Sequence, residues 1–296
     1  MKKKLIVISG ATASGKTDLA IEIAKYFNTE ILSADSRQCY KEMNIGVAKP
    51  SESQLKEITH YFINSHSVYN EVNASVYENY GLQILEKIFQ KNEIAVCVGG
   101  TGLYIKALCE GIDPMPPIDK EIEQNISHLY KVNGLAWLQQ EIQKVDTLFA
   151  ESAEMQNPHR LLRALIFKLS TNQSILDFRK KEVKNRYFDI KYFAIDIDRN
   201  ILYDRINKRV DSMIQEGLIE EVKKLLQHKH LKALNTVGYN ELFLFLNNEC
   251  DIDFAIEKIK QHTRNYAKRQ ITWCKNQQQY KWIKPKYENI IQALNI

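Results

Sequence analysis

The feature that most constrains the fold of this chain is Gly10–Thr17, which reads Gly-Ala-Thr-Ala-Ser-Gly-Lys-Thr. It follows the short apolar run Leu5–Ser9 and fits G-x-x-x-x-G-K-T, the P-loop pattern. The backbone N–H groups of such a loop bind phosphate oxygens, while the lysine adds positive charge and the threonine offers a hydroxyl to Mg²⁺. Apolar residues at helical spacing follow, so we expect a helix whose N-terminus points at the phosphate. The pattern predicts a diphosphate or triphosphate ligand and leaves open which molecule carries it.

Apolar runs and helical periodicity alternate along the chain, which favours an α/β fold. The runs suited to buried parallel strands are Leu5–Ser9, Glu30–Ala34, Ile94–Val98 and Tyr192–Ile197. The segments with helical spacing are Asp18–Phe27, Val76–Phe89, Asp198–Glu216 and Leu218–His228. We therefore expect a P-loop NTPase-like parallel sheet flanked by helices.

A helical insertion domain interrupts this pattern. Pro114-Met115-Pro116-Pro117 is a stiff break, and the chain that follows reads as helical to about Lys191. We expect an α/β core from residues 1–114 and 192–296 and an insertion domain over 115–191. Near the C-terminus we expect one long helix over Asp251–Gln279, followed by a basic tail that ends in Trp282.

Composition excludes several classes of protein. The five cysteines are widely spaced and odd in number, and the seven histidines lack ligand spacing, so we expect reduced thiols and no structural metal site. No apolar stretch approaches the roughly 20 residues of a membrane span. We expect a cytoplasmic protein that does not bind membranes. The net charge of +5 does not by itself indicate nucleic acid.

Polar residues follow two of the expected strands, where ligands collect in parallel sheets. Asp35 follows the second strand. Three roles fit this position: a Mg²⁺ ligand, a general base, or a carboxylate that caps the next turn. Thr101 follows the third strand within Gly99-Gly-Thr-Gly102. These glycines allow close approach of the backbone to a ligand, or they form a plain turn.

Basic residues gather in three further places. Arg205 and Arg209 are four apart on one helix face, as a clamp for phosphate oxygens or as solvated side chains. Arg160 and Arg163 likewise share a face. From Lys258 to Lys286 the chain has no Asp or Glu, while aromatic residues alternate with Lys and Arg. This last pattern suits RNA, although a solvated basic face is the usual explanation.

Taken in order, these segments resemble the bacterial tRNA dimethylallyltransferases, also called tRNA isopentenyltransferases. The resemblance covers nearly the whole chain. It rests on Gly10–Thr17, Asp35–Tyr40 with Ile45–Pro50, Gly99–Tyr104, Asn157–Ala164, Arg205–Arg209 with Met213, Val237–Tyr239 and Ala267–Trp273. Ala11, Val47 and Ile166 depart from the residues most common in that family, and none of them matches a catalytic position.

The resemblance implies transfer of a dimethylallyl group from dimethylallyl diphosphate to N6 of the adenosine just 3′ of the anticodon. It implies catalytic roles for Asp35 as general base, Thr101 and Arg209, and Mg²⁺ held at Thr17. The diphosphate-binding residues would be Gly10, Ala11, Thr12, Ala13, Ser14, Gly15, Lys16 and Thr17. The tRNA-binding residues would be Ser36, Arg37, Gln38, His159, Arg160, Arg163, Gly238, Tyr239, Lys268, Arg269, Gln270, Trp273 and Lys275. We expect a monomer.

Three other functions compete with this reading. An adenylate isopentenyltransferase would run the same chemistry on free nucleotides, although the insertion and the basic C-terminal helix argue against it. A small-molecule or nucleoside kinase would use the P-loop for ATP. A non-catalytic RNA-binding P-loop protein would transfer no group, from either a prenyl diphosphate or ATP.

Overall fold

The computed structural model describes residues 3–152, 155–179 and 182–294, which form two compact units. The larger unit joins Met1–Glu110 to Lys184–Ile296, and the smaller unit is Gly111–Val183. The boundaries expected from sequence were therefore a few residues off at both ends of the insertion. The C-terminal boundary moves furthest, to Lys184, because the chain already bonds to the core there: the N–H of Lys184 donates to the carbonyl oxygen of Glu110, and Arg186 donates to that of Leu108.

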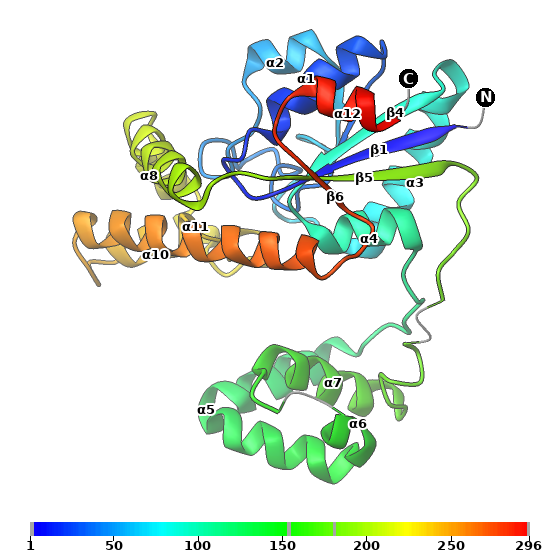
Figure 1. Ribbon diagram of the computed structural model, residues 1–296. Helices are drawn as coiled ribbons and strands as arrows, with labels where there is room; N and C mark the ends of the chain where they lie inside the picture. Colours follow the sequence, from blue (N-terminus) through cyan, green and yellow to red (C-terminus); the bar gives the residue numbers. More distant parts are fainter. Residues whose placement is uncertain (1–2, 153–154, 180–181, 295–296) are drawn as a thin grey trace. The chain divides into compact units, whose positions relative to one another are not determined.

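A parallel sheet forms the centre of the larger unit (Figure 1). The described residues give it six strands, in the order β3-β2-β4-β1-β5-β6. All five pairings between neighbouring strands are parallel, which confirms the expected α/β class. The strands are β1 (Lys4–Ser9), β2 (Ile31–Ser33), β3 (His60–Tyr61), β4 (Ile94–Gly99), β5 (Asp189–Ile195) and β6 (Lys281–Ile283).

Helices cover both faces of this sheet, as the alternation along β1 requires. Leu5 and Val7 belong to the cluster that packs under α3 (Ala74–Lys91) and α4 (Gly102–Glu110). Ile6 and Ile8 belong to the cluster on the opposite face, under α1 (Lys16–Tyr26) and α12 (Tyr287–Leu294). Because β1 is buried on both sides, its sequence is a continuous apolar run.

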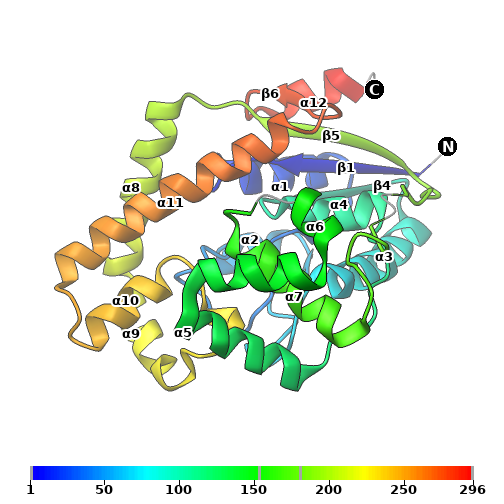
Figure 2. The same cartoon turned by 90° about the horizontal axis from the view of Figure 1, so that it is seen from below.

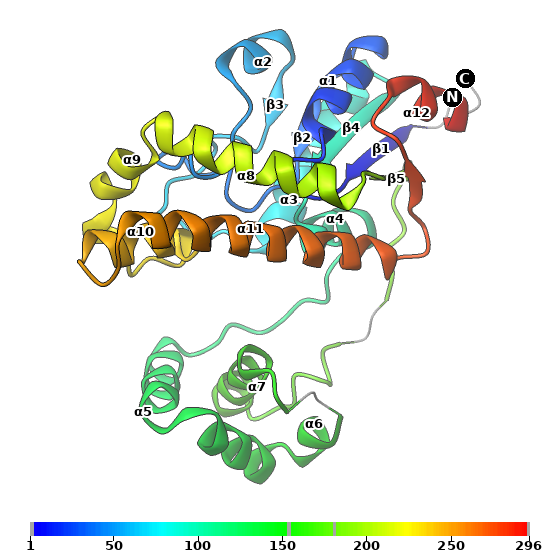
Figure 3. The ribbon, with the colours of Figure 1, turned by 60° about the vertical axis from the view of Figure 1, so that its left-hand side comes forward.

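A layer of helices lies beyond the carboxyl ends of the strands. It contains α8 (Arg199–Gln215), α9 (Leu218–Lys224), α10 (Tyr239–Leu246) and α11 (Ile252–Lys275). The helices α8 and α11 run side by side, as Figure 3 shows. Both begin at an aspartate cap, since Asp198 accepts hydrogen bonds from two backbone N–H groups of α8 and Asp251 from one of α11. The chain connects these elements through the short helices α2 (Glu52–Glu57), η1 (Leu226–His228) and η2 (Lys232–Leu234).

The smaller unit is helical, as expected, and has its own core. Its helices are α5 (Lys120–Val145), α6 (Thr147–Ser152) and α7 (Pro158–Thr171). The helix α5 bends at Gly134, where φ is 75°. Buried residues such as Leu138, Phe149 and Leu161 pack together within this unit.

The structure corrects the expected C-terminus. The long helix ends at Lys275, and Lys281–Ile283 forms the edge strand β6 beside β5 instead of a basic tail. Tyr280 is buried in the core, and Trp282 packs against it, so neither side chain lies open for stacking on a base. In contrast, the expectation of unpaired thiols is confirmed, since all five cysteines in the described part of the chain are free.

None of the helices in the described part of the chain combines the length and the apolar character needed to cross a lipid bilayer.

Candidate active site

The loop Gly10–Gly15 leads from β1 into α1 with the backbone of a phosphate-binding turn. Ala13 adopts a left-handed conformation with φ of 62°, and Gly15 does so with φ of 88°. Gly15 is the N-cap of α1 and supplies no side-chain cap, so the first N–H groups of the helix are left for a ligand. The hydroxyl of Ser14 is buried and has no hydrogen-bond partner among the described residues. Such a loop offers donors to an anion, as the sequence pattern predicts.

Lys16 is the charged group of this loop. Its ammonium donates a hydrogen bond to the carbonyl oxygen of Ala11 at 3.1 Å. Burial lowers the pKa of Lys16 to about 8, although the nearby carboxylate of Asp35 opposes this shift and the charge of Arg209 adds to it. An incoming phosphate group would favour the charged ammonium and reverse the effect of burial.

The P-loop opens into a cavity of about 430 Å³. Its wall combines the loop with the end of β2, the segment 46–50, the helices α8 and α11, and the connection before α10. Thr12, Lys16, Thr17 and Arg209 form a polar part of the lining, and Asp35 lines the same cavity. The P-loop, the end of β2, α8 and α11 are far apart in the sequence, and the tertiary structure brings all four to one cavity.

Asp35 has two roles in the structure. One carboxylate oxygen, Oδ1, accepts hydrogen bonds from the backbone N–H groups of Arg37 at 2.8 Å and Gln38 at 3.2 Å. The turn-capping alternative is therefore confirmed. The same side chain is half-buried and lines the cavity, so the turn fixes the orientation of a carboxylate that faces a ligand site.

Thr101 supports this turn from the next strand. Its hydroxyl oxygen accepts a hydrogen bond from the N–H of Ser36 at 3.0 Å. Its own N–H donates to the carbonyl oxygen of Ala34 at 3.1 Å. Thr101 is not among the residues that line the cavity, so it contacts the site through the residues that flank Asp35.

The glycines around Thr101 make room for α11. A Cβ at Gly100 would lie 2.0 Å from Nε2 of Gln270, and one at Gly102 would lie 2.1 Å from Nε1 of Trp273. The sequence predicted that these glycines let the backbone approach a ligand closely. In the structure, side chains of α11 occupy the space beside Gly100 and Gly102.

Gln270 bridges the P-loop and this glycine turn. Its side-chain oxygen accepts from the N–H of Thr12 at 2.8 Å, and its nitrogen donates to the carbonyl oxygen of Gly100 at 3.0 Å. The side chain is buried, so both ends of its amide are used inside the protein. Sequence reasoning placed Gln270 and Trp273 in a tRNA-binding surface and missed this packing role, because the partners lie 170 or more residues away.

Two arginines of α8 lie beside the P-loop. Arg209 donates a long hydrogen bond of 3.4 Å to the hydroxyl of Thr12. Arg205, one turn earlier, places a guanidinium nitrogen 3.9 Å from the position that a Cβ of Gly15 would occupy. Both side chains are exposed, and of the two only Arg209 lines the cavity, so the clamp on phosphate oxygens stays a prediction.

A carboxylate that the sequence did not single out holds another wall of the cavity. Glu221 of α9 accepts hydrogen bonds from the N–H groups of Asn44, Ile45 and Gly46 at 2.9 to 3.0 Å. It also accepts one from the hydroxyl of Tyr239 at 2.6 Å. No local pattern marks Glu221, because three of its partners lie in the loop 44–46, more than 170 residues earlier.

The residues predicted from the resemblance to bind tRNA fall into two groups in the larger unit. Arg37, Gln38 and Tyr239 are engaged with the protein: Arg37 donates to the carbonyl oxygen of Asn235, Gln38 to those of Val47 and Ala48, and Tyr239 is fully buried. The second group consists of Lys268, Arg269 and Lys275, whose side chains are exposed on α11. The second group keeps its basic character available to a ligand.

His159, Arg160 and Arg163 lie on α7 of the smaller unit. The helix begins at Asn157, whose side chain accepts from the N–H of Arg160, and at Pro158 in its first turn. All three side chains are exposed. Arg179 lies close enough that the charges of Arg163 and Arg160 add to burial in lowering its pKa, so it joins the same basic surface.

Side chains that hold metal ions do not cluster in the described part of the chain, where no group of three or more His, Cys, Asp or Glu residues could enclose one. The donors near the phosphate loop are instead oxygen atoms of Thr17 and Asp35 on the cavity wall. This donor set suits a hard cation that keeps phosphate and water ligands.

Comparison with solved structures agrees with this geometry. The chain is similar to the tRNA Δ(2)-isopentenylpyrophosphate transferase of Staphylococcus epidermidis, with a TM-score of 0.71, 32% identity, and 99% of both chains covered. It is similar to the tRNA isopentenylpyrophosphate transferase of Bacillus halodurans, with a TM-score of 0.72, 28% identity, and 99% and 94% covered.

Curated sequences extend the same likeness. The tRNA dimethylallyltransferase of Christiangramia forsetii is 44% identical over 283 residues, 96% of this chain and 94% of that protein. The tRNA dimethylallyltransferase 1 of Bacteroides fragilis is 41% identical over 289 residues, 98% of this chain and 96% of that protein. The family model described as IPP transferase matches residues 38–277. On its sequence and its fold, this chain belongs to the IPP transferase family.

Proposed function

We propose that this protein transfers a dimethylallyl group from dimethylallyl diphosphate to N6 of the adenosine 3′-adjacent to the anticodon of tRNA, and releases diphosphate. The observation that carries the proposal is one cavity that joins a P-loop, an arginine of α8 and the carboxylate of Asp35. The names of the relatives, tRNA dimethylallyltransferases, agree with it.

The donor lies with its diphosphate on the P-loop. Lys16, Arg209 and the loop N–H groups stabilise the negative charge that grows on the leaving diphosphate as the C–O bond breaks. The apolar lining continues from Arg209 along α8 to Val210 and Met213 and then to Leu218. Val210 and Met213 are three residues apart on α8, and Leu218 is the first residue of α9; together they give the prenyl chain an apolar wall.

The acceptor adenosine places its N6 between the donor carbon and Asp35. The amino nitrogen forms the new C–N bond with its electron pair, the bridging oxygen leaves with the electrons of the C–O bond, and Asp35 accepts the proton. The base must leave the stacked anticodon loop to enter the cavity. Thr101 holds the Asp35 turn in place through Ser36.

Mg²⁺ is the metal that we propose for this site, with the hydroxyl of Thr17 as its protein ligand. Diphosphate oxygens and water would supply its other ligands. Bound there, the cation would neutralise charge on the diphosphate. Lys16 and Arg209 would neutralise the remaining negative charge on the diphosphate.

The partner is tRNA, and we propose that its phosphates meet the exposed basic residues of α11 and of α7. Those residues are Lys268, Arg269 and Lys275 on α11 and His159, Arg160 and Arg163 on α7. We further propose that the protein acts as a monomer in the cytoplasm, where its substrate is found.

The test incubates the protein with an unmodified tRNA transcript, labelled dimethylallyl diphosphate and Mg²⁺. We expect label in the tRNA, diphosphate in equal amount, and no requirement for ATP. Parallel reactions contain AMP in place of tRNA, or labelled ATP with nucleoside acceptors. Transfer to AMP alone would identify an adenylate isopentenyltransferase, and phosphoryl transfer from ATP would identify a kinase.

A further inference from the structure

A second groove, of about 560 Å³, lies between α10 and α11. Figure 2 shows α10 beside the end of α11 that is remote from β6. Its lining includes Asn240, Leu244, Phe254, Lys258, His262 and Arg269. Neither the catalytic chemistry nor the packing of the sheet uses this groove.

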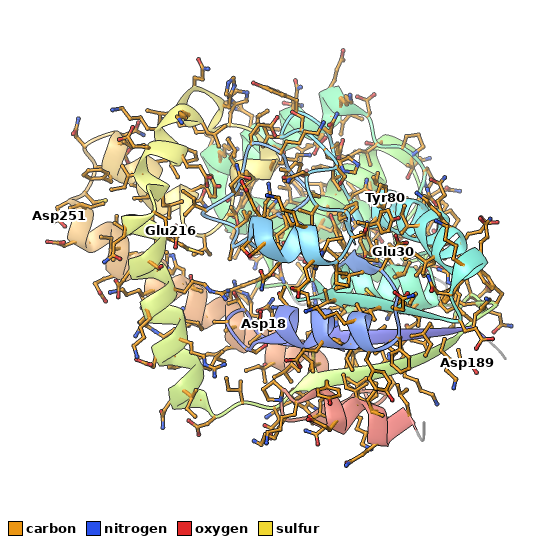
Figure 4. The ribbon with its side chains drawn as sticks, turned by 90° about the horizontal axis from the view of Figure 1, so that it is seen from above. Asp18, Glu30, Tyr80, Asp189, Glu216 and Asp251 are labelled. Atoms are coloured by element: carbon orange, nitrogen blue, oxygen red, sulfur yellow. The ribbon has the colours of Figure 1, made fainter. Side chains whose placement is uncertain are left out.

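One face of α11 forms a wall of the groove. Phe254, Lys258, His262 and Arg269 all line it, and their spacings of four, four and seven residues place them on the same side of a helix. Figure 4 labels Asp251, the N-cap at which α11 begins. The wall therefore combines an aromatic ring with cationic groups along one line.

The mouth of the groove is apolar and open. Phe254 of α11 is 50% exposed and Leu244 of α10 is 42% exposed, and the two line the same groove. The ammonium of Lys258 lies 5.3 Å from the centre of the Phe254 ring. An exposed ring beside a positive charge is the combination that binds a nucleobase together with its phosphate.

The inner part of the groove is held by a buried carboxylate. Glu241 accepts from Nδ1 of His262 at 2.6 Å and, through its other oxygen, from the N–H of Gly238 at 2.7 Å. Both oxygens of this acid are engaged by donors of the protein, and the cationic side chains that line the groove are those of Lys258 and Arg269. Gly238 lines the catalytic cavity, and Glu241 therefore links the two sites through one side chain.

The groove also shares wall residues with the catalytic cavity. Val237, Asn240 and Arg269 line both. The two spaces are therefore neighbours, so adjacent nucleotides of one strand could occupy them. Arg269 stands at this boundary, where a phosphodiester group that joins two nucleotides would pass.

We propose that the α10–α11 groove is a subsite for an unpaired nucleotide that neighbours the acceptor adenosine in the RNA, with its base on Phe254 and its phosphates at Lys258 and Arg269. This inference rests on the proposed function, because it takes the occupant of the catalytic cavity to be an adenosine of the same strand. The cationic side chains of the groove and its continuity with the catalytic cavity favour RNA over a peptide.

The test is a double-mutant cycle that combines one substitution in the protein with removal of one base from the RNA. An anticodon stem-loop is made with the natural base or with an abasic nucleotide immediately 5′ or immediately 3′ of the acceptor. We expect Phe254→Ala to weaken binding of the natural stem-loop about ten-fold. The same substitution should change binding less than two-fold when the abasic site falls at the position that occupies the groove.

Tyr26→Ala is the matched control, since Tyr26 is 53% exposed on α1, away from the groove. It should leave binding unchanged with every stem-loop. Equal effects of Phe254→Ala on the natural stem-loop and on both abasic stem-loops would overturn the proposal, as would no effect at all. Thermal melting of each variant checks that the fold is intact.

A salt titration tests the phosphate contact separately. Lys258→Ala should reduce the slope of log Kd against log salt by about 0.7, the value for one contact with a single strand. Lys91→Ala, at an exposed position on α3, should leave the slope unchanged. If the unaltered protein transfers no dimethylallyl group to the stem-loop, the proposed function fails; if it does and both variants match their controls, only the groove proposal fails.

Discussion

Lys16 shows how one residue meets two opposing demands. Its ammonium must be charged to hold the diphosphate that we propose for this site, yet burial in the loop lowers its pKa to about 8. In the free enzyme the charge is therefore present below pH 8 and is lost as the pH rises through that value. The residue is adapted to gain its full charge from the ligand that it binds.

We predict that kcat/KM for the donor falls as the pH rises above about 8, because kcat/KM reports the ionisation of the free enzyme. The measurement is a profile from pH 6 to 9.5 with saturating tRNA. Lys16→Arg is the control, since a guanidinium stays charged over this range. A decline of the same shape in that variant would assign it to another group, such as Lys49, whose pKa burial also lowers to about 8.

The proposed role of Asp35 as general base can be separated from its structural role by one substitution. Asparagine keeps the oxygen that accepts from Arg37 and Gln38, so Asp35→Asn should preserve the turn and remove only the proton acceptor. We predict that kcat falls by at least about 100-fold and that the Kd for tRNA stays within about three-fold. Single-turnover rates and filter binding measure the two quantities. An Asp35→Asn variant with nearly normal kcat would show that another group takes the proton.

At the scale of elements, the walls of the cavity depend on anchors between distant segments. The loop 44–46 lies on α9 and α10, where a Cβ at Gly46 would come within 2.6 Å of Tyr239 and 2.9 Å of Leu218. Three hydrogen bonds from its N–H groups to Glu221 hold it there, and a fourth, from the hydroxyl of Tyr239, orients the Glu221 carboxylate. Gly46 of this loop and the next two residues, Val47 and Ala48, line the cavity, so the position of the loop affects the shape of the site.

We predict that Glu221→Gln frees this loop, because one acceptor oxygen becomes an NH₂ group that faces N–H or O–H donors. Amide hydrogen exchange at Asn44, Ile45 and Gly46 should accelerate about ten-fold or more, and kcat/KM should fall about ten-fold. Glu220→Gln is the matched control, as it makes the same change at the exposed neighbour in the same helical turn. Equal exchange rates in the two variants would contradict the anchoring role.

At the scale of the whole molecule, the chain enters and leaves the smaller unit at one place. The N–H of Lys184 donates to the carbonyl oxygen of Glu110 at 2.8 Å, so the two ends of the core meet where the smaller unit begins and ends. Arg186 fastens the returning chain, as it donates to the carbonyl oxygens of Leu108 and Ala107 and pairs with the buried Glu78.

We predict that residues 111–183 are replaceable by a two- or three-residue Gly-Ser linker without unfolding the core. The excised protein should melt cooperatively and bind diphosphate with Mg²⁺ within about three-fold of the full chain, since the P-loop and α8 are intact. Transfer to tRNA should fall by at least about 100-fold, because the basic face of α7 is gone. Calorimetry, diphosphate titration and the transfer assay measure these outcomes, and undiminished transfer would remove α7 from the tRNA-binding surface.

Local chemistry made much of the fold predictable. The P-loop, the buried strands β1 and β4 and the capped helix α8 follow from patterns within ten to twenty residues, and each lies within a few residues of its predicted bounds. The short strands β3 and β6 were missed, because two or three residues carry no periodicity of their own. Lys281–Ile283 becomes a strand only because the edge of β5 offers it hydrogen-bond partners.

The sequence by itself determined that a phosphate-binding loop follows a buried strand and that Asp35, Thr101 and Arg209 lie near it in the fold. Its ordered motifs also determined the family. Only the tertiary structure decided that Gln270 ties the P-loop to the glycine turn, that Glu221 holds the wall loop, and that Tyr239 is buried. The reason is physical: loop geometry, capping and periodicity are local, whereas a hydrogen bond across 170 residues exists only once the chain has folded.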